Sequence, residues 1–321
     1  MKFDSLILSD GTRGMENQSI AISKYLDLNY KVLKIKPNFF IKNFPKLALL
    51  FYLFFKKQIL FLKKFKFLYL ITTGRRMSGY SILAKKVLKN NFYSIHLQDP
   101  KIHPSLFDIL VVPKHDQLVA KNVFKTQGAL TFFTQKDIDF SYKLIKEKFN
   151  PFKRPLVFLL LGGDNKRYKP NYSEYCRFLL NVKKAVENIS GSLVISTSRR
   201  TPDKVLKIIK LIFVSFDKNF YLINEKEKKF YPGILKKTDY VIVTSDSVNM
   251  ISEVATTDSM LFVGYIREEN KKILKFNKFF ENKSYTKKFN GHLYNYNKIK
   301  LADRHELKKQ VTSYIKESLK K

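Results

Sequence analysis

The hydroxyl and carboxyl groups best suited to bind a ligand lie between Tyr240 and Glu253 (YVIVTSDSVNMISE). An apolar strand pattern ends at Thr244, polar residues follow directly, and a helical pattern begins at Val248. Parallel sheets bind ligands at the carboxyl ends of their strands, and the start of a helix offers N–H groups to a phosphate. We therefore predict a phosphate- or nucleotide-binding loop here. Its predicted binding residues are Ser245, Asp246, Ser247, Ser252 and Glu253.

The same segment has a simpler interpretation. Glu253 falls nearly two turns into the helix, where a carboxylate could reach ribose hydroxyls. Asp246 or Ser247 could equally be the N-cap of that helix, with Glu253 merely solvated. Spacing alone does not distinguish a ligand site from helix capping.

Two more loops follow strand patterns in this half of the chain. Ser196–Pro202 (STSRRTP) holds adjacent arginines, which are uncommon in a chain with ten Arg and 51 Lys among its 61 basic residues. Such a pair can clamp a phosphate through paired N–H donors. In Leu161–Asn165 (LGGDN), two glycines allow the backbone to approach a ligand closely. The predicted phosphate-binding residues are Gly162, Gly163, Ser198, Arg199, Arg200 and Thr201. The alternatives are a solvated arginine pair, an ordinary turn, and Ser198 or Thr201 as a helix cap.

In the N-terminal half, Leu8–Gln18 (LSDGTRGMENQ) follows a strand pattern and resembles a dinucleotide-binding loop that lacks its third glycine. Thr72–Arg76 (TTGRR) is a similar loop after another strand pattern. We expect this side to hold an acceptor, with Asp10, Gly11, Gly14, Asn17, Gln18 and Arg75 as its residues.

The best candidate for proton transfer is His115 beside Asp116, in the PKHD segment after a strand pattern. Imidazole titrates near neutral pH and suits general acid–base catalysis. A lone loop histidine is more often structural, so both roles remain open for His115.

The elements that would position these loops alternate strand and helix, which is typical of βαβ units and parallel sheets. The expected strands are Phe3–Leu8, Lys31–Ile35, Phe67–Thr72, Phe92–Leu97, Ile109–Val112, Pro155–Leu161, Ser192–Thr197, Phe220–Ile223, Tyr240–Thr244 and Met260–Val263. The main expected helices are Gln18–Leu26, Ser78–Leu88, Ser173–Ile189, Asp203–Ile212 and Val248–Thr256.

The segment Asn150–Pro155 (NPFKRP), with two prolines between two such series, is typical of an interdomain linker. We expect an α/β protein of two Rossmann-like parallel-sheet domains that face a cleft. Residues 1–150 would form the acceptor-side domain and 151–321 the nucleotide-binding domain, with the last helix packing back on the first.

The net charge of +34 predicts attraction to nucleotides, anionic lipid or nucleic acid. The Lys, Asn, Phe, Ile and Tyr content is typical of an AT-rich genome, so part of this charge is compositional. No RRM, KH or helix-turn-helix pattern occurs, and we expect no specific nucleic-acid partner. Zinc-protease, Walker and GxSxG motifs are also missing from the sequence, and we predict neither a metal site nor a bound cofactor.

The segment Phe39–Phe67 interleaves Phe, Leu and Lys. Its longest apolar run has nine residues, fewer than the roughly 20 that a membrane-spanning helix needs. It could lie on an anionic membrane surface, or form a buried helix pair with solvated lysines. With no signal-peptide pattern at the start, we expect a cytoplasmic protein. If Phe39–Phe67 lies on a membrane, we expect the protein to be peripheral on the inner face of the cytoplasmic membrane.

In order along the chain, the segments DGTRGMENQ, QDP, FDILVVPKHD, LGGDN, STSRRTP and VTSDSVNMISE resemble the bacterial relatives of the plant "elongated mitochondria" fission-factor family. The resemblance runs from about Asp10 to Val263 and implies a glycosyltransferase-B-like pair of Rossmann domains. It departs at SEVATTDSMLFV, where Asp258 and Met260 stand in place of the family's usual glycine and proline. Bacterial members are commonly labelled as nucleoside-diphosphate-sugar-related, whereas plant members act at the mitochondrial outer membrane.

Two functions follow. The first is binding of a nucleoside-diphosphate sugar by a metal-independent, glycosyltransferase-like enzyme near the membrane or cell envelope, with the sugar donor as substrate. The alternative is a non-catalytic adaptor at a membrane surface, related to the mitochondrial fission factors.

Overall fold

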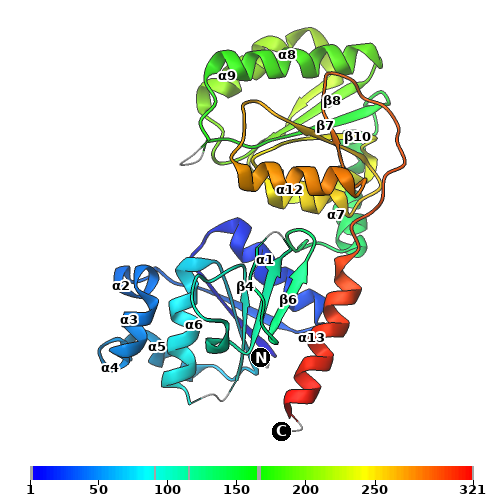
Figure 1. The fold of residues 1–321 in the computed structure, drawn as a ribbon. Helices are drawn as coiled ribbons and strands as arrows, with labels where there is room; N and C mark the ends of the chain where they lie inside the picture. Colours follow the sequence, from blue (N-terminus) through cyan, green and yellow to red (C-terminus); the bar gives the residue numbers. More distant parts are fainter. Residues whose placement is uncertain (1–2, 90–91, 115, 165–167, 320–321) are drawn as a thin grey trace. The chain divides into compact units, whose positions relative to one another are not determined.

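The computed structural model describes residues 3–89, 92–114, 116–164 and 168–319 (Figure 1). The chain forms two α/β units. Unit 1 comprises Met1–Phe132 with Ala302–Lys321, and unit 2 comprises Phe133–Leu301. The expected linker at 150–155 lies inside unit 2, between α7 (Gln135–Phe149) and β7 (Leu156–Leu161).

The described part of unit 1 contains a six-stranded parallel sheet in the order β2-β1-β3-β4-β5-β6. Its strands are β1 (Ser5–Ser9), β2 (Tyr30–Lys34), β3 (Tyr69–Thr73), β4 (Tyr93–Leu97), β5 (Ile109–Pro113) and β6 (Val123–Thr126). The chain adds β2 on one side of β1 and β3 on the other, so the strand order reverses between β1 and β3.

Alternate residues of these strands face opposite sides of the sheet. Ile7 and Ile71 pack with α1 (Arg13–Tyr25) and α13 (Asp303–Leu319). On the other face, Leu6 and Leu70 pack against α6 (Arg75–Val87). The C-terminal helix α13 therefore contributes to the core of unit 1 (Figure 1).

The segment Phe39–Phe67 lies against α6 as a series of short helices. These are α2 (Phe39–Asn43), α3 (Pro45–Leu50), α4 (Tyr52–Phe55), α5 (Lys57–Leu60) and the 3₁₀ helix η1 (Phe61–Lys64). Pro45 opens α3, where its missing N–H costs no helical hydrogen bond. Within the described residues, no helix of the protein combines the length and the apolar character needed to cross a membrane.

Unit 2 repeats the architecture, with strand order β12-β11-β10-β7-β8-β9 among its described residues, all parallel. The strands after β7 are β8 (Ser192–Thr197), β9 (Phe220–Leu222), β10 (Tyr240–Thr244), β11 (Met260–Gly264) and β12 (Lys287–Lys288). The reversal of strand order falls between β7 and β10.

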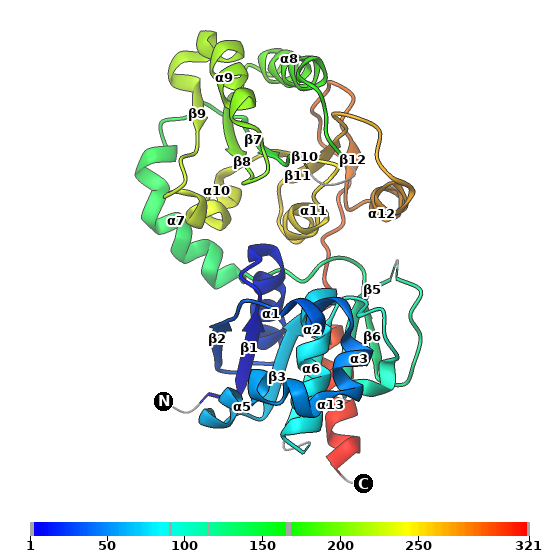
Figure 2. The same cartoon turned by 90° about the vertical axis from the view of Figure 1, so that its left-hand side faces the viewer.

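Helices cover both faces of this sheet (Figure 2). Val157 and Leu159 pack with α8 (Tyr172–Asn188) and α9 (Asp203–Ile212). Phe158, which faces the other way, contacts Tyr231 of α10. The remaining elements of unit 2 are η3 (Val214–Asn219), η4 (Lys228–Phe230), α10 (Tyr231–Lys237), α11 (Val248–Ala255) and α12 (Lys271–Asn282); unit 1 also contains η2 (Pro104–Leu106).

All ten expected strands are present, each within two residues of its predicted bounds, and the parallel α/β architecture is confirmed. The prediction was wrong for the start of the first helix, because α1 begins at Arg13 and not at Gln18. Half of the expected Leu8–Gln18 loop is therefore helical, and Gly14, Asn17 and Gln18 belong to α1.

We expect Leu307→Ala in α13 to lower the free energy of unfolding by about 2–5 kcal/mol, because it leaves a cavity among fully packed side chains. Guanidinium unfolding followed by circular dichroism measures the change. Lys309→Ala, at an exposed position of the same helix, is the matched control and should have almost no effect. Equal stability of the two variants would contradict the placement of α13 in the core.

Candidate functional site

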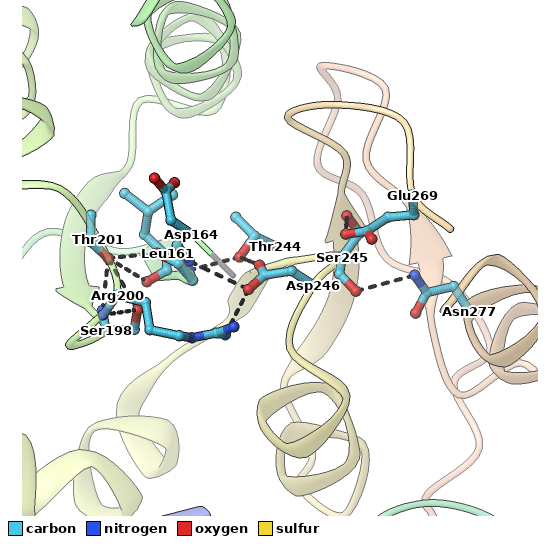
Figure 3. Close-up of polar contacts among 12 residues, drawn as sticks. Leu161, Asp164, Ser198, Arg200, Thr201, Thr244, Ser245, Asp246, Glu269 and Asn277 are labelled. Carbon is cyan, nitrogen blue, oxygen red and sulfur yellow. Dashed lines mark hydrogen bonds and ion pairs between the residues drawn. The ribbon is translucent and has the colours of Figure 1, made fainter. Parts of the chain in front are cut away.

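The loops that the sequence singles out in unit 2 follow adjacent strands. Gly162 and Gly163 come after β7, Ser198–Thr201 after β8, and Ser245–Ser247 after β10. These loops all lie at the carboxyl edge of the sheet, on either side of the point where strand order reverses (Figure 3). Open α/β sheets bind their ligands at such reversal points.

The carboxylate of Asp246 joins the three loops. Its Oδ1 accepts a hydrogen bond from Thr244 Oγ1 at 2.7 Å, and its Oδ2 accepts from Arg200 Nη2 at 2.8 Å and from the Gly163 N–H at 3.4 Å (Figure 3). The Asp246 side chain has no exposed surface, whereas 42% of the Arg200 side chain is exposed. Arg200 is thus held by Asp246, while part of its side chain remains accessible to a ligand.

The two glycines are required by this packing. A Cβ on Gly162 would overlap the Asp246 carboxylate, and a Cβ on Gly163 would overlap the backbone carbonyl of Arg200. The Gly162 N–H also donates to Thr244 Oγ1 at 2.7 Å. The pair therefore allows the turn after β7 to fit between the other two loops.

Thr201 connects the loop after β8 to the end of β7 by hydrogen bonds. Its hydroxyl donates to the Gly162 carbonyl at 2.5 Å and accepts from the Ser198 N–H at 3.0 Å. The predicted alternative, Ser198 or Thr201 as a helix cap, is wrong, because the N-cap of α9 is Pro202 and no side chain caps that helix. Arg199 is exposed beside Arg200.

The start of α11 is not capped by a side chain. Ser247 is the N-cap residue, but its hydroxyl makes no capping hydrogen bond, and the Asp246 carboxylate is engaged elsewhere. The first i→i−4 bond of the helix runs from the Ile251 N–H to the Ser247 carbonyl at 3.0 Å. Ser247 is therefore the N-cap residue, as the alternative interpretation allowed, but its side chain does not cap the helix, and Asp246 is not the N-cap. The positive end of the α11 dipole lies next to Asp246, the partner of Arg200.

The other predicted residues of this segment support the loop from inside. Ser245 is fully buried and donates to Glu269 Oε1 at 2.9 Å. Ser252 is also fully buried and donates to the Val248 carbonyl at 2.8 Å. Glu253 is 7% exposed, and its Oε2 accepts a hydrogen bond from Tyr231 Oη at 3.0 Å.

Burial raises the pKa of the Asp246 carboxyl above its ordinary value of 3.8, although Thr244 and Arg200 act in the opposite direction. Burial also raises the pKa of Glu269, and the nearby charge of Asp246 raises it further. Two carboxyl groups are thus held in a poorly solvated environment below the loops.

The carboxyl edge of unit 1 is organised in the same way around its own reversal point. Asp10, after β1, accepts from the Thr12 N–H at 2.9 Å and lies 3.7 Å from Arg76, after β3. Gly11 adopts a φ of +79°, and its N–H donates to Ser9 Oγ at 3.0 Å. This edge is therefore polar, and local hydrogen bonds fix the loop after β1.

The remaining predicted residues of unit 1 lie near this edge. Gln18 Oε1 accepts from Gln98 Nε2 at 3.4 Å, while Gly14 and Asn17 are on the first turns of α1. Arg75 is exposed at the start of α6, and Asp116 is 9% exposed. His115 lies outside the described residues.

No group of three or more His, Cys, Asp or Glu residues suited to a metal ion occurs in the described part of the chain. The sequence analysis missed Glu269 and Tyr231, which hold Ser245 and Glu253. Glu269 follows β11 at the same edge of the sheet, so the strand-end rule that selected the other loops could have selected it.

Solved structures share this two-unit architecture. The S. aureus MnaA–UDP co-structure has a TM-score of 0.53 at 13% identity, with 98% of this chain and 88% of that chain covered. For the Neisseria meningitidis UDP-GlcNAc 2-epimerase bound to UDP-GlcNAc, the TM-score is 0.52 at 13% identity, with both chains fully covered. For the Methanocaldococcus jannaschii UDP-GlcNAc 2-epimerase it is 0.55 at 15% identity, with 97% and 92% covered. The class is therefore the glycosyltransferase-B-like fold of two Rossmann-like units.

Within that class, the chain belongs to the Mitochondrial fission ELM1 family, whose model matches residues 13–314. It is 25% identical over 297 residues to the Uncharacterized protein RP120 of Rickettsia prowazekii, covering 81% of this chain and 82% of that protein. It is 26% identical over 252 residues to the Mitochondrial fission protein ELM1 of Arabidopsis thaliana, covering 70% of this chain. That second match spans 57% of the plant protein.

We expect the raised pKa of Asp246 to give a pH-dependent contribution to stability. Between 3.8 and the raised pKa, the folded state holds a proton on Asp246 that the unfolded state has lost, so the contribution is largest at low pH and is lost as pH rises through the raised pKa. The difference in unfolding free energy between the native protein and Asp246→Asn should therefore shift in favour of the variant as pH rises from about 4 to 7. Urea unfolding at several pH values measures it. A constant difference over this range would contradict the assignment.

Proposed function

We propose that unit 2 binds a nucleoside-diphosphate sugar at the carboxyl edge of its sheet, beside β7 and β10. The observation that carries the proposal is the uncapped start of α11 next to the half-exposed guanidinium of Arg200. N–H groups at a helix start and an arginine fork are both donors that match phosphate oxygens. Their convergence at the reversal point of the sheet favours an anionic ligand over plain structural roles.

Within this proposal, the predicted residues divide into ligands and positioning residues. In this proposal, the ligands of the diphosphate are Arg199, Arg200, Ser198 and Ser247. Gly162, Gly163, Thr201 and Asp246 position them through the hydrogen bonds of the loops. Glu253 keeps Tyr231 in place and is proposed as a positioning residue.

The comparisons support a nucleotide-sugar ligand. The S. aureus protein was solved with UDP and the N. meningitidis protein with UDP-GlcNAc, and both share the fold over at least 98% of this chain. A uridine diphosphate sugar is therefore the first ligand to test.

We extend the proposal to glycosyltransferase-like chemistry. Breaking the bond between the anomeric carbon and the diphosphate oxygen leaves negative charge on the diphosphate. Arginine and helix N–H groups placed at that charge stabilise the leaving group. The polar edge of unit 1, with Asp10 and Arg75, is the proposed site of the acceptor, and Asp116 a proposed catalytic residue there.

We expect UDP and UDP-GlcNAc to raise the melting temperature, because a ligand at 100 times its Kd stabilises the folded state by about 2.7 kcal/mol. Arg200→Ala should weaken UDP binding by roughly 10–100-fold, the range for a lost hydrogen bond to a charged group. Differential scanning fluorimetry and isothermal titration calorimetry measure the two effects.

The matched control is Arg154→Ala. Arg154 also forms an ion pair with an aspartate, Asp239, but it precedes β7 and so lies at the amino edge of the same sheet. This variant should bind UDP like the native protein. If UDP-, GDP- and ADP-sugars all fail to raise the melting temperature, the nucleotide-sugar proposal is wrong.

A further inference from the structure

The outer surface of the short helices α2–α4 is apolar and exposed. Leu50 is 71% exposed and Phe54 is 82% exposed, well above what a packed side chain shows. Their neighbours on this surface, here called the α2–α4 face, are Phe39, Phe40, Phe44, Leu47, Phe51 and Leu53, each at least 46% exposed. An exposed cluster of this size on a folded protein marks an interaction surface.

The exposure does not come from a poorly packed segment. Ile41 of α2 and Ala48 of α3, on the inner side of the same helices, are at most 1% exposed and pack on α6, as does Ile59 of the following helix α5. Gly79 of α6 allows α2 to approach so closely that a Cβ there would overlap the Ile41 carbonyl. Asn38 caps α2 by accepting from the Phe40 N–H at 2.9 Å. The α2–α4 face is therefore the outer side of a well-anchored layer of helices beside α6 (Figure 1).

The charge around this face is of one sign. No Asp or Glu occurs between Asp27 and Asp99, a stretch of 71 residues that contains 13 Lys and two Arg. Lys46, Lys56 and Lys57 are exposed beside the apolar side chains. In the part of the chain that the structure describes, none of the lysines from 42 to 66 forms an ion pair with a carboxylate.

A groove of about 790 Å³ borders the face. Leu49, Leu50 and Tyr52 supply apolar walls from the α3–α4 side. Lysines 46, 85, 86 and 89 supply ammonium groups around it, of which Lys85 also pairs with Asp108. An apolar wall beside several ammonium groups matches a lipid, whose acyl chains and phosphate need these two environments.

We propose that the α2–α4 face docks on the surface of an anionic phospholipid bilayer. The phenylalanine and leucine side chains would enter the boundary between headgroups and acyl chains, and the lysines would contact the lipid phosphates. This surface belongs to unit 1, and the proposal does not depend on nucleotide binding by unit 2.

Two other occupants fit the surface less well. A second copy of the same chain would bring the same lysines against each other with no acidic residue in either face to neutralise them. Nucleic acid would satisfy the lysines but would leave large aliphatic and aromatic side chains unburied between phosphates. A bilayer with anionic headgroups satisfies both groups at once.

The test is flotation of the full-length protein with two kinds of vesicle, one of phosphatidylcholine alone and one that also contains about 30% phosphatidylglycerol. We expect binding to the anionic vesicles only. The double variant Leu50→Ser/Phe54→Ser and the charge-reversal variant Lys56→Glu/Lys57→Glu should each reduce the partition coefficient about tenfold or more. Because all four side chains are exposed, these variants should keep the native melting temperature.

Matched controls come from unit 2. Leu211 and Val214 are each 74% exposed, so Leu211→Ser/Val214→Ser removes equally exposed apolar side chains elsewhere. Lys207→Glu/Lys210→Glu makes the same charge change at an exposed helix. Both controls should bind vesicles like the native protein.

The absence of tryptophan from the chain provides a second measurement. In Phe54→Trp, the single indole should show a blue-shifted emission with anionic vesicles and quenching by brominated lipid. In Leu211→Trp it should show neither. Equal binding of all variants, an unshifted Phe54→Trp emission on bound vesicles, or self-association through this face without vesicle binding would each overturn the proposal.

Discussion

The buried carboxylate of Asp246 determines the shape of the candidate site, because it contacts the loops after β7 and β8 from the loop after β10. An ionised carboxylate without water needs several donors, and Gly163, Thr244 and Arg200 supply them. Each donor is thereby fixed in place. Gly162 and Gly163 are needed because the turn after β7 passes directly against this carboxylate and the loop beside it. The ion pair with Asp246 fixes the orientation of the Arg200 guanidinium, so its exposed part always faces the same way. The hydrogen bonds that offset the free-energy cost of burying the Asp246 carboxylate thus also fix the loops at the carboxyl edge of the sheet.

Most of the fold follows from patterns in the sequence. Central parallel strands such as β7 and β10 are continuous apolar runs because both faces are covered, and they were predicted with accurate bounds. The strands β6 and β12 were missed, since edge strands are short and bury little: β12 consists of two lysines. The helix α10 was also missed, because Pro232 and Gly233 argue against a helix locally, while the close approach of Gly233 to Ser141 in α7 stabilises it through tertiary packing.

The candidate site was predictable in position and not in detail. Polar residues at strand ends identified the three loops, since carboxyl ends of parallel strands share one edge. The strand order that makes β7 and β10 neighbours is a long-range property that no local pattern contains. The roles of individual side chains also depend on direction: Ser245 and Ser252 are turned inward, whereas Ser247 at the start of α11 is partly exposed. Hydroxyl-bearing residues so close together in the chain cannot be separated into ligands and supports by spacing.

The return of α13 to unit 1 has a consequence for how the protein forms on the ribosome. Leu307, Val311 and Ile315 fill the core beneath one face of the first sheet, yet they are synthesised after every residue of unit 2. While residues 133–301 emerge and collapse around their own sheet, the nascent first unit still exposes the apolar side chains that α13 will cover, among them Ile22 and Ile71. The core of unit 1 can therefore be completed only after all of unit 2 has been synthesised. The interval before α13 emerges is when the nascent chain is most exposed to chaperones and to aggregation.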